Sequence, residues 1–253
     1  MNQPSVQKAI DLLVRLQAKT TPSTLAYWVT PNTVLTLCGA RAYCDGVFYG
    51  PKAELKNWRQ EVDNSIDVIK SLTDVYFADT KMHRNQFGDY VWYELVLSEG
   101  IGYISNQSVL LTQAQLTQIL NLAKPDLLQP TLRRLLKANP KLSAYNTSHL
   151  DHLGFGIMLG YPDKAILASV TYWQADDPEA DKLVDANITG ADFYNCPQPI
   201  YAYPRSLIDD PTIRAHEQLW SKLLKDFYAS DFHKALAKNP DFHIKAKRLG
   251  LLD

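Results

Sequence analysis

The feature that most limits the fold of this chain is an apolar stripe at helical spacing between residues 53 and 72. Its members recur every three or four positions and therefore share one face of a predicted helix: Leu55, Trp58, Val62, Ile66 and Ile69. A helix with one apolar face buries that face against a second layer. The segments Val75–Ala78 and Tyr90–Leu97 are rich in aromatic and β-branched residues, which predicts strands soon after this helix.

The same periodicity predicts two further helices, over Ser5–Lys19 and from Asp210 to Tyr228. Helices therefore bracket clusters of short strands, and a strict β-α-β alternation is not evident. This order favours an α+β fold with a mostly antiparallel sheet and flanking helices. We expect one globular domain over residues 1–253, with a possible subdivision near residues 112–148 into a strand-rich part and a helical part.

Shorter patterns give local predictions. Strands are expected at Leu25–Val29 and Gly100–Ser105, and a turn at Asn85–Asp89. Asp45-Gly46 is a dipeptide typical of a type I′ hairpin turn, so a hairpin is expected there. Lys245–Arg248 is expected to be a small solvated basic tail.

Composition excludes some classes of protein. The net charge of −1 over 253 residues argues against a dedicated nucleic-acid binder, which normally carries a basic face. No stretch reaches the roughly 18 apolar residues of a membrane span. Three cysteines without a C-x-x-C pair, and no apolar run near residue 1, lead us to expect a reducing, cytoplasmic setting.

The segment Ser148–Pro162 is the candidate site. Ser148 and Asp151 form a weak capping box, while Gly160 and Pro162 end the pattern, which predicts a helix. Alternatively the helix ends near Gly154, and the following five residues form a buried strand. Glycine inside a helix costs about 1 kcal/mol relative to alanine, so something should offset this cost.

Helical spacing places His149, Gly156 and Gly160 on one stripe, flanked by His152. This bare stripe either packs against another part of the chain or admits a ligand. Tyrosines from the Pro-rich stretch Thr189–Ser206, expected to be irregular, could border it or could simply pack over the core. The candidate ligand-binding residues are His149, His152, Gly156, Gly160, Tyr161, Tyr201 and Tyr203.

No metal site and no particular cofactor are predicted. His149 and His152 could supply two metal nitrogens, but spacing nominates no third ligand, and a structural role for both rings is an alternative. The acidic run from Asp176 to Asp181 is better explained as a helix start. The contexts of a dinucleotide loop, a zinc-protease helix, a nucleophile elbow and a phosphate-binding loop are absent from the sequence.

His152 and the run Leu159-Gly-Tyr-Pro162 resemble a His-x-x-Gly-x-x-Leu-Gly-Tyr-Pro segment of bacterial families of unknown function. With Pro22–Ala26 and Thr171–Trp173 included, the similarity covers well under half the chain. The spacing from either histidine to the first glycine departs from that segment, and a preceding Phe-Pro is missing. The resemblance implies no reaction and gives only a hint of fold.

Three hypotheses for function follow. The first is a binding protein with a small-molecule or peptide pocket where the glycine stripe, the histidines and the Tyr/Pro-rich stretch meet. The second is an enzyme, a hydrolase or transferase, that uses His149 or His152 as a general base. The third is a structural or interaction protein without chemistry.

Overall fold

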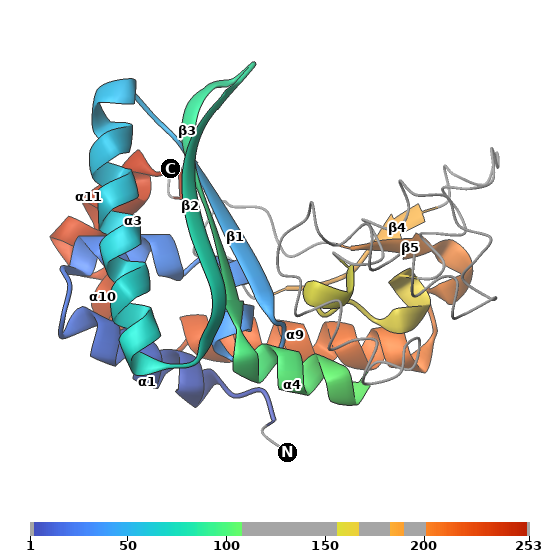
Figure 1. Ribbon diagram of the computed structural model, residues 1–253. Helices are drawn as coiled ribbons and strands as arrows, with labels where there is room; N and C mark the ends of the chain where they lie inside the picture. The colour runs from blue at the N-terminus through green and yellow to red at the C-terminus, as the bar shows by residue number, and fades with distance from the viewer. Residues whose placement is uncertain (1–2, 108–155, 167–182, 190–200, 252–253) are drawn as a thin grey trace.

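The computed structural model describes residues 3–107, 156–166, 183–189 and 201–251 (Figure 1). A three-stranded antiparallel sheet has the order β1-β3-β2, formed by Tyr43–Tyr49, Gly88–Leu97 and Val75–Asn85 respectively. Two short strands, β4 (Leu183–Asp185) and β5 (Ala202–Pro204), form a second antiparallel pair. The fold is α+β, which confirms the predicted class.

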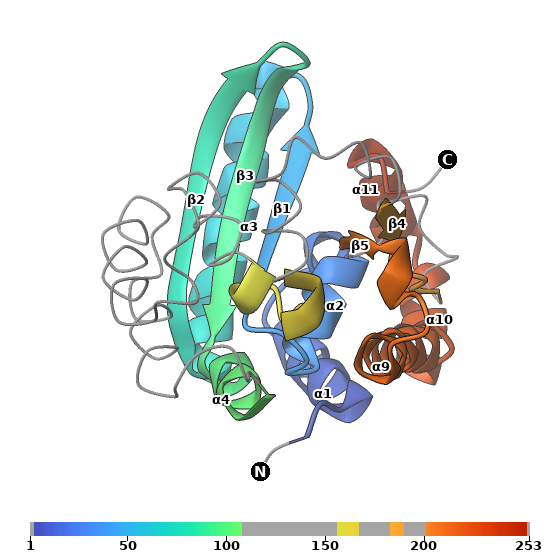
Figure 2. The same cartoon turned by 90° about the vertical axis from the view of Figure 1, so that its right-hand side faces the viewer.

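Helix α3 (Lys52–Leu72) covers one face of the sheet (Figures 1 and 2). All five members of its predicted apolar stripe are buried. Val91, Tyr93 and Leu95 of β3 share one face of the strand and are buried in the core. The chain turns from β2 into β3 at Gly88, whose φ is +128°. The predictions of this helix, of the turn at 85–89 and of the strand at 90–97 are confirmed.

The remaining helices lie mainly beside the sheet rather than on it (Figure 2). Their bounds are α1 Val6–Gln17, the 3-10 helix η1 Pro22–Trp28, α2 Pro31–Leu37, α4 Ser98–Gln107, the 3-10 helix η3 Arg205–Leu207, α9 Pro211–Tyr228, α10 Asp231–Ala237 and α11 Pro240–Arg248. Asp210 caps α9, its side chain accepting hydrogen bonds from two backbone N–H groups of the first turn, as its sequence predicts.

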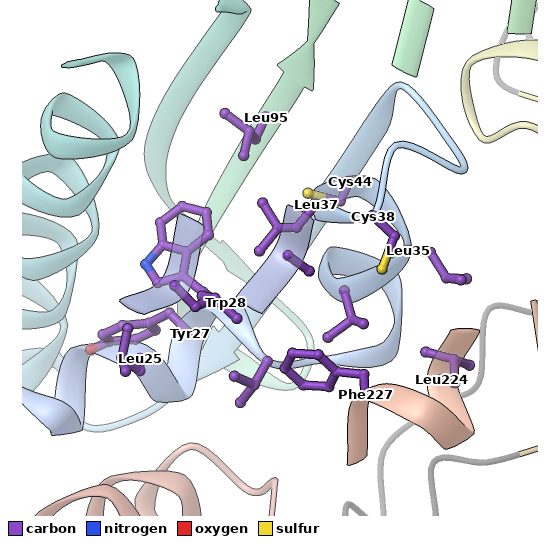
Figure 3. Packing of buried hydrophobic residues seen from close by; sticks show 14 of the residues in the cluster. Leu25, Tyr27, Trp28, Leu35, Leu37, Cys38, Cys44, Leu95, Leu224 and Phe227 are labelled. Carbon is purple, nitrogen blue, oxygen red and sulfur yellow. The ribbon is translucent and has the colours of Figure 1, made fainter. Parts of the chain in front are cut away.

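One apolar core joins residues from both ends of the chain. Leu25, Tyr27 and Trp28 of η1 lie near Leu95 of the sheet and Phe227 of α9 (Figure 3). The Tyr228 hydroxyl donates to the carbonyl oxygen of Val29 at 2.8 Å, which ties α9 to the end of η1. The first and last thirds of the sequence therefore share a single hydrophobic interior.

Two predictions in the first third are wrong. Leu25–Val29 is not a strand: Pro22 begins the 3-10 helix η1, and its residues from Leu25 to Trp28 are all buried, without the alternation of a half-exposed strand. Asp45-Gly46 is not a hairpin turn, because β1 runs straight through it. Glycine is required at 46 for another reason, since a Cβ there would overlap the Tyr93 ring.

Three further predictions need correction. Gly100–Ser105 belongs to helix α4 rather than to a strand, and a Cβ at Gly100 would overlap the backbone of Arg41 and Ala42, so a bare residue permits the close approach. The stretch predicted as irregular holds β5 and η3 among its described residues. Lys245–Arg248 is the end of helix α11 rather than a solvated tail, and Lys245 is buried.

Candidate functional site

The predicted site lies only partly within the described residues. His149 and His152 fall outside them, as does most of the segment predicted to be helical from Ser148 onward. Residues 156–158 are helical, so the alternative of a buried strand after Gly154 is wrong for these positions. The possible domain boundary near residues 112–148 also falls outside the described residues.

The two glycines of the stripe pack against the chain itself. An added Cβ at Gly156 would lie 3.0 Å from Ile166 Cγ1. Gly160 has a φ of +72°, and a Cβ there would lie 3.0 Å from the Ala40 carbonyl oxygen and 3.1 Å from Arg41 Cβ. Gly160 is therefore the left-handed residue after the last helical turn, as predicted, and its bare side faces the start of β1. Of the two explanations offered for the stripe, close packing accounts for both described glycines.

A pocket opens beside Gly160. It has a volume of about 530 Å³ and lies between α4, the segment 156–166 and the first half of α9. Its described lining is mostly apolar or aromatic: Tyr103, Ile104, Ile157, Gly160, Tyr161, Pro162, Asp163, Lys164, Thr212, Ala215, His216 and Leu219. Gly160 and Tyr161 are thus the two predicted site residues that reach this pocket.

His216 forms part of the pocket wall and was not among the predicted site residues. Its Nε2 atom lies 2.8 Å from the Gly160 carbonyl oxygen, and its Nδ1 atom lies 3.1 Å from the Tyr201 hydroxyl. Because a carbonyl oxygen only accepts, Nε2 carries the proton and Nδ1 accepts from Tyr201. Burial lowers the pKa of His216 to about 4, and the nearby Arg41 guanidinium adds to this effect. The ring is therefore neutral at pH 7, and both nitrogens are used within the protein.

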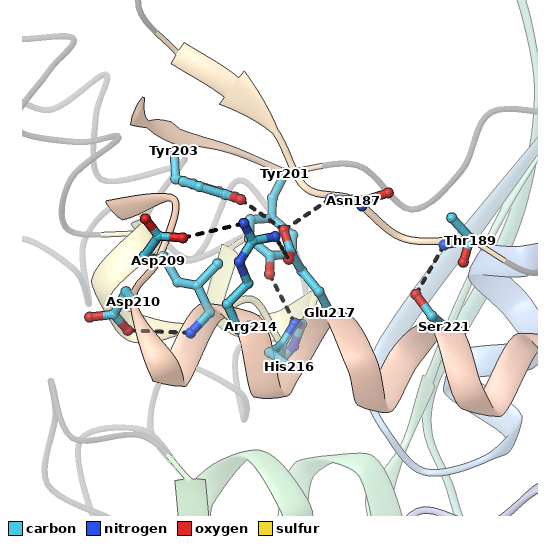
Figure 4. A network of polar contacts seen from close by, with 11 residues as sticks. Asn187, Thr189, Tyr201, Tyr203, Asp209, Asp210, Arg214, His216, Glu217 and Ser221 are labelled. Atoms are coloured by element: carbon cyan, nitrogen blue, oxygen red, sulfur yellow. Dashed lines mark hydrogen bonds and ion pairs between the residues drawn. The ribbon is translucent and has the colours of Figure 1, made fainter. Parts of the chain in front are cut away.

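Tyr201 and Tyr203 are not part of the pocket lining, and Figure 4 shows them beside His216 and Glu217 of α9. The Tyr201 ring is 5.0 Å from that of Tyr161 and positions His216 through the hydroxyl contact. The Tyr203 hydroxyl donates to Glu217 Oε1 at 2.8 Å, and burial raises the pKa of Tyr203 to about 12. Both were predicted to bind a ligand; in the structure their hydroxyl groups contact His216 and Glu217 of α9.

Glu217 joins the two-stranded sheet to α9. Its carboxylate is almost fully buried, accepting from Tyr203, from the backbone N–H of Asn187 at 2.9 Å and from Arg214 at 3.2 Å (Figure 4). Three donors satisfy this buried charge, which is the condition for placing it in an apolar interior. These contacts hold the turn of α9 that carries His216 in place.

Arg41 supplies a buried positive charge next to the site. Its Nε donates to the Tyr43 carbonyl oxygen at 3.0 Å, one terminal nitrogen donates to Asn32 Oδ1 at 2.7 Å, and its guanidinium lies 5.5 Å from the centre of a Trp220 ring. Burial lowers the pKa of Arg41. These contacts hold the guanidinium behind the pocket and account for its influence on the neighbouring histidine.

The helical pattern of α9 contained the signal for His216. Thr212, Ala215, His216 and Leu219 lie at i, i+3, i+4 and i+7 and therefore share one stripe, separate from the core-facing residues Ile213, Trp220 and Leu224. Nothing in this spacing, however, indicates that the Gly160 segment faces that stripe. That neighbourhood depends on contacts between distant parts of the chain.

Other kinds of site receive no support within the described ranges. No group of three or more His, Cys, Asp or Glu side chains there is placed to hold a metal ion. Among the same residues, no helix combines the length and the apolar character needed to cross a membrane. Comparison of the chain with protein-family models, with curated proteins and with solved structures gives no match.

Proposed function

We propose that this protein binds a small molecule in the pocket between α4, the segment 156–166 and α9. The observation that carries the proposal is the pocket itself: its volume of about 530 Å³ falls within the roughly 300–1,000 Å³ typical of ligand sites. Its lining combines apolar and aromatic walls with a few polar groups, which is the usual composition of such sites.

The supporting contacts favour binding over catalysis by His216. A general base needs a nitrogen free to take a proton from the substrate, and both ring nitrogens of His216 are engaged by Gly160 and Tyr201. The histidine instead ties the Gly160 turn to α9 across one side of the pocket. A wall built in this way is fixed before a ligand arrives, which reduces the ordering cost of binding.

The test fills the pocket with a larger side chain by mutation. Ala215 is an exposed residue of α9 that lines the pocket, so Ala215→Trp adds an indole into the cavity without replacing a core residue. Ala229, exposed at the C-terminal cap of the same helix and outside the pocket lining, provides the matched control Ala229→Trp. The wild type and both variants are screened against a metabolite library by thermal shift.

We expect compounds that raise the melting temperature of the wild type to do so equally in Ala229→Trp and to lose their effect in Ala215→Trp. Binding that raises the melting temperature reflects affinity for the folded state. Compounds that stabilise all three proteins equally bind elsewhere, and a library that stabilises none of them contradicts the proposal.

We also propose a reducing compartment, the cytoplasm, as the setting. Cys38 and Cys44 are buried free thiols, and burial raises the pKa of each to about 12. Such thiols are protonated at neutral pH and unreactive, as expected of cysteines that serve as small apolar residues. Quantifying free thiols in denatured protein isolated from its native cell would test this, because three reduced cysteines per chain are expected.

A further inference from the structure

Among the described lining residues, Asp163, Lys164 and His216 are already engaged. Lys164 Nζ donates to Asp210 Oδ2 at 2.6 Å, and this contact lowers the pKa of Asp210. Asp163 also has an interaction partner, and His216 is neutral with both nitrogens in use. A charged ligand would have to compete with these contacts or enter without a partner of opposite charge.

Two hydroxyl groups of the lining have a different status. Those of Tyr103 and Thr212 form no hydrogen bond with any other residue that the structure describes. Burial raises the pKa of Tyr103, so its hydroxyl stays protonated and can donate at neutral pH. These groups can hydrogen-bond to a ligand without giving up an existing contact.

We infer that the pocket takes an uncharged, ring-containing ligand whose carbonyl or amide group accepts a hydrogen bond from the Tyr103 hydroxyl. This inference rests on the proposed function and specifies the class of ligand. An unpaired charge moved from water into an apolar cavity is strongly disfavoured, whereas a neutral ring is favoured by the apolar wall. Tyr103 and Tyr161 both line the pocket, and aromatic rings pack favourably against one another.

The experiment compares three probes with the same ring system and different charge: 2-naphthamide, 2-naphthoate and 2-naphthylmethylammonium. Dissociation constants are measured by titration at pH 7. We expect the amide to bind at least about tenfold more tightly than either ion, because every charged side chain among the described lining residues already has a partner. Binding of the carboxylate or the ammonium with equal or higher affinity overturns the inferred ligand class and leaves the proposed binding function standing.

A second measurement assigns the hydrogen bond. Tyr103→Phe removes one oxygen atom and keeps the ring, so we expect the amide to bind about five- to tenfold more weakly and 2-methylnaphthalene to bind unchanged. Tyr90→Phe, on β3 outside the pocket lining, is the matched control, and melting temperatures verify that both variants fold. Unchanged amide affinity in Tyr103→Phe overturns the role of this hydroxyl.

Failure of all naphthalene probes to bind wild-type protein also overturns the inference. The Ala215→Trp screen then decides separately whether the pocket binds any small molecule. The inferred ligand class can therefore fail while the proposed binding function stands.

Discussion

Lys245 is the residue whose replacement tests the structure most directly, because the sequence alone suggests an unimportant solvated lysine. In the structure it is 8% exposed and joins α11 to both α3 and η1. Its Nζ donates to Glu61 Oε2 at 2.6 Å and lies 5.0 Å and 5.2 Å from the ring centres of Tyr27 and Trp58. The Tyr27 hydroxyl donates to the same carboxylate oxygen at 2.8 Å.

The expected cost follows from these contacts. The charge contributes about 1 kcal/mol through the ion pair, since the Glu61 side chain is 38% exposed and partly screened by solvent. The two aromatic contacts add about 0.5–1 kcal/mol each. Lys245→Met keeps most of the buried stem and should lower the free energy of unfolding by about 2 kcal/mol. Lys245→Ala also removes about three buried methylene groups at about 0.8 kcal/mol each, so it should cost about 4 kcal/mol.

Urea unfolding followed by circular dichroism measures both values, with Lys234→Ala on α10, an exposed lysine, as the control expected within about 0.5 kcal/mol of wild type. The order wild type, Lys245→Met, Lys245→Ala is the essential result. If Lys245→Ala behaves like the control, Lys245 is solvated and the packing of α11 on η1 is wrong. If the two Lys245 variants lose equal stability, the buried stem contributes nothing.

Two further predictions concern buried groups. Burial lowers the pKa values of His216 and His233 to about 4 in the folded protein, against about 6.5 when unfolded. The unfolded chain therefore binds more protons between these values, so stability should fall from pH 6.5 to pH 4, by up to about 3 kcal/mol per histidine, and then level off. Urea midpoints across this range should show a slope that is reduced in His216→Phe, and an unchanged slope contradicts the assignment. Gly46→Ala should lower the free energy of unfolding by about 2–3 kcal/mol, because its methyl group overlaps the Tyr93 ring. Thermal unfolding measures this change, and a stability equal to wild type would mean that β1 does not pass so close to that ring.

The parts of the fold that the sequence predicted correctly are those with long regular periodicity. The apolar stripes of α3 and α9 and the aromatic and β-branched run of β3 each involve many residues of one kind of pattern. Their burial follows from the pattern itself, whatever the neighbouring element is. The fold class could therefore be predicted without knowledge of a single tertiary contact.

The errors lie where a residue type has two physical explanations. Glycine at position 46 suits a hairpin turn, but it is also the residue that allows the Tyr93 ring to pack over a continuous strand. Gly100 weakens a helical pattern, yet it allows α4 to approach the backbone at Arg41. Only the three-dimensional neighbour distinguishes these explanations, and local spacing does not contain it.

At the candidate site, too, the sequence predicted some of the residues that line the pocket and missed those that depend on distant contacts. Gly160 and Tyr161 were expected at a binding surface and do line the pocket, whereas Tyr201 and Tyr203 are not part of its lining and contact His216 and Glu217. His216 was missed because its contact with the Gly160 carbonyl joins positions 56 residues apart. The presence of His149 and His152 at the site stays a prediction, because both lie outside the described residues.

The packing of α11 on η1 has a consequence for how the protein is made. Tyr27 and Trp28 emerge from the ribosome more than two hundred residues before helix α11, which covers them. Until then the nascent chain carries an uncovered aromatic surface, the kind of surface that chaperones bind and that promotes aggregation. Ribosome stalling before α11, or loss of α11, should therefore leave an aggregation-prone intermediate rather than a smaller native protein.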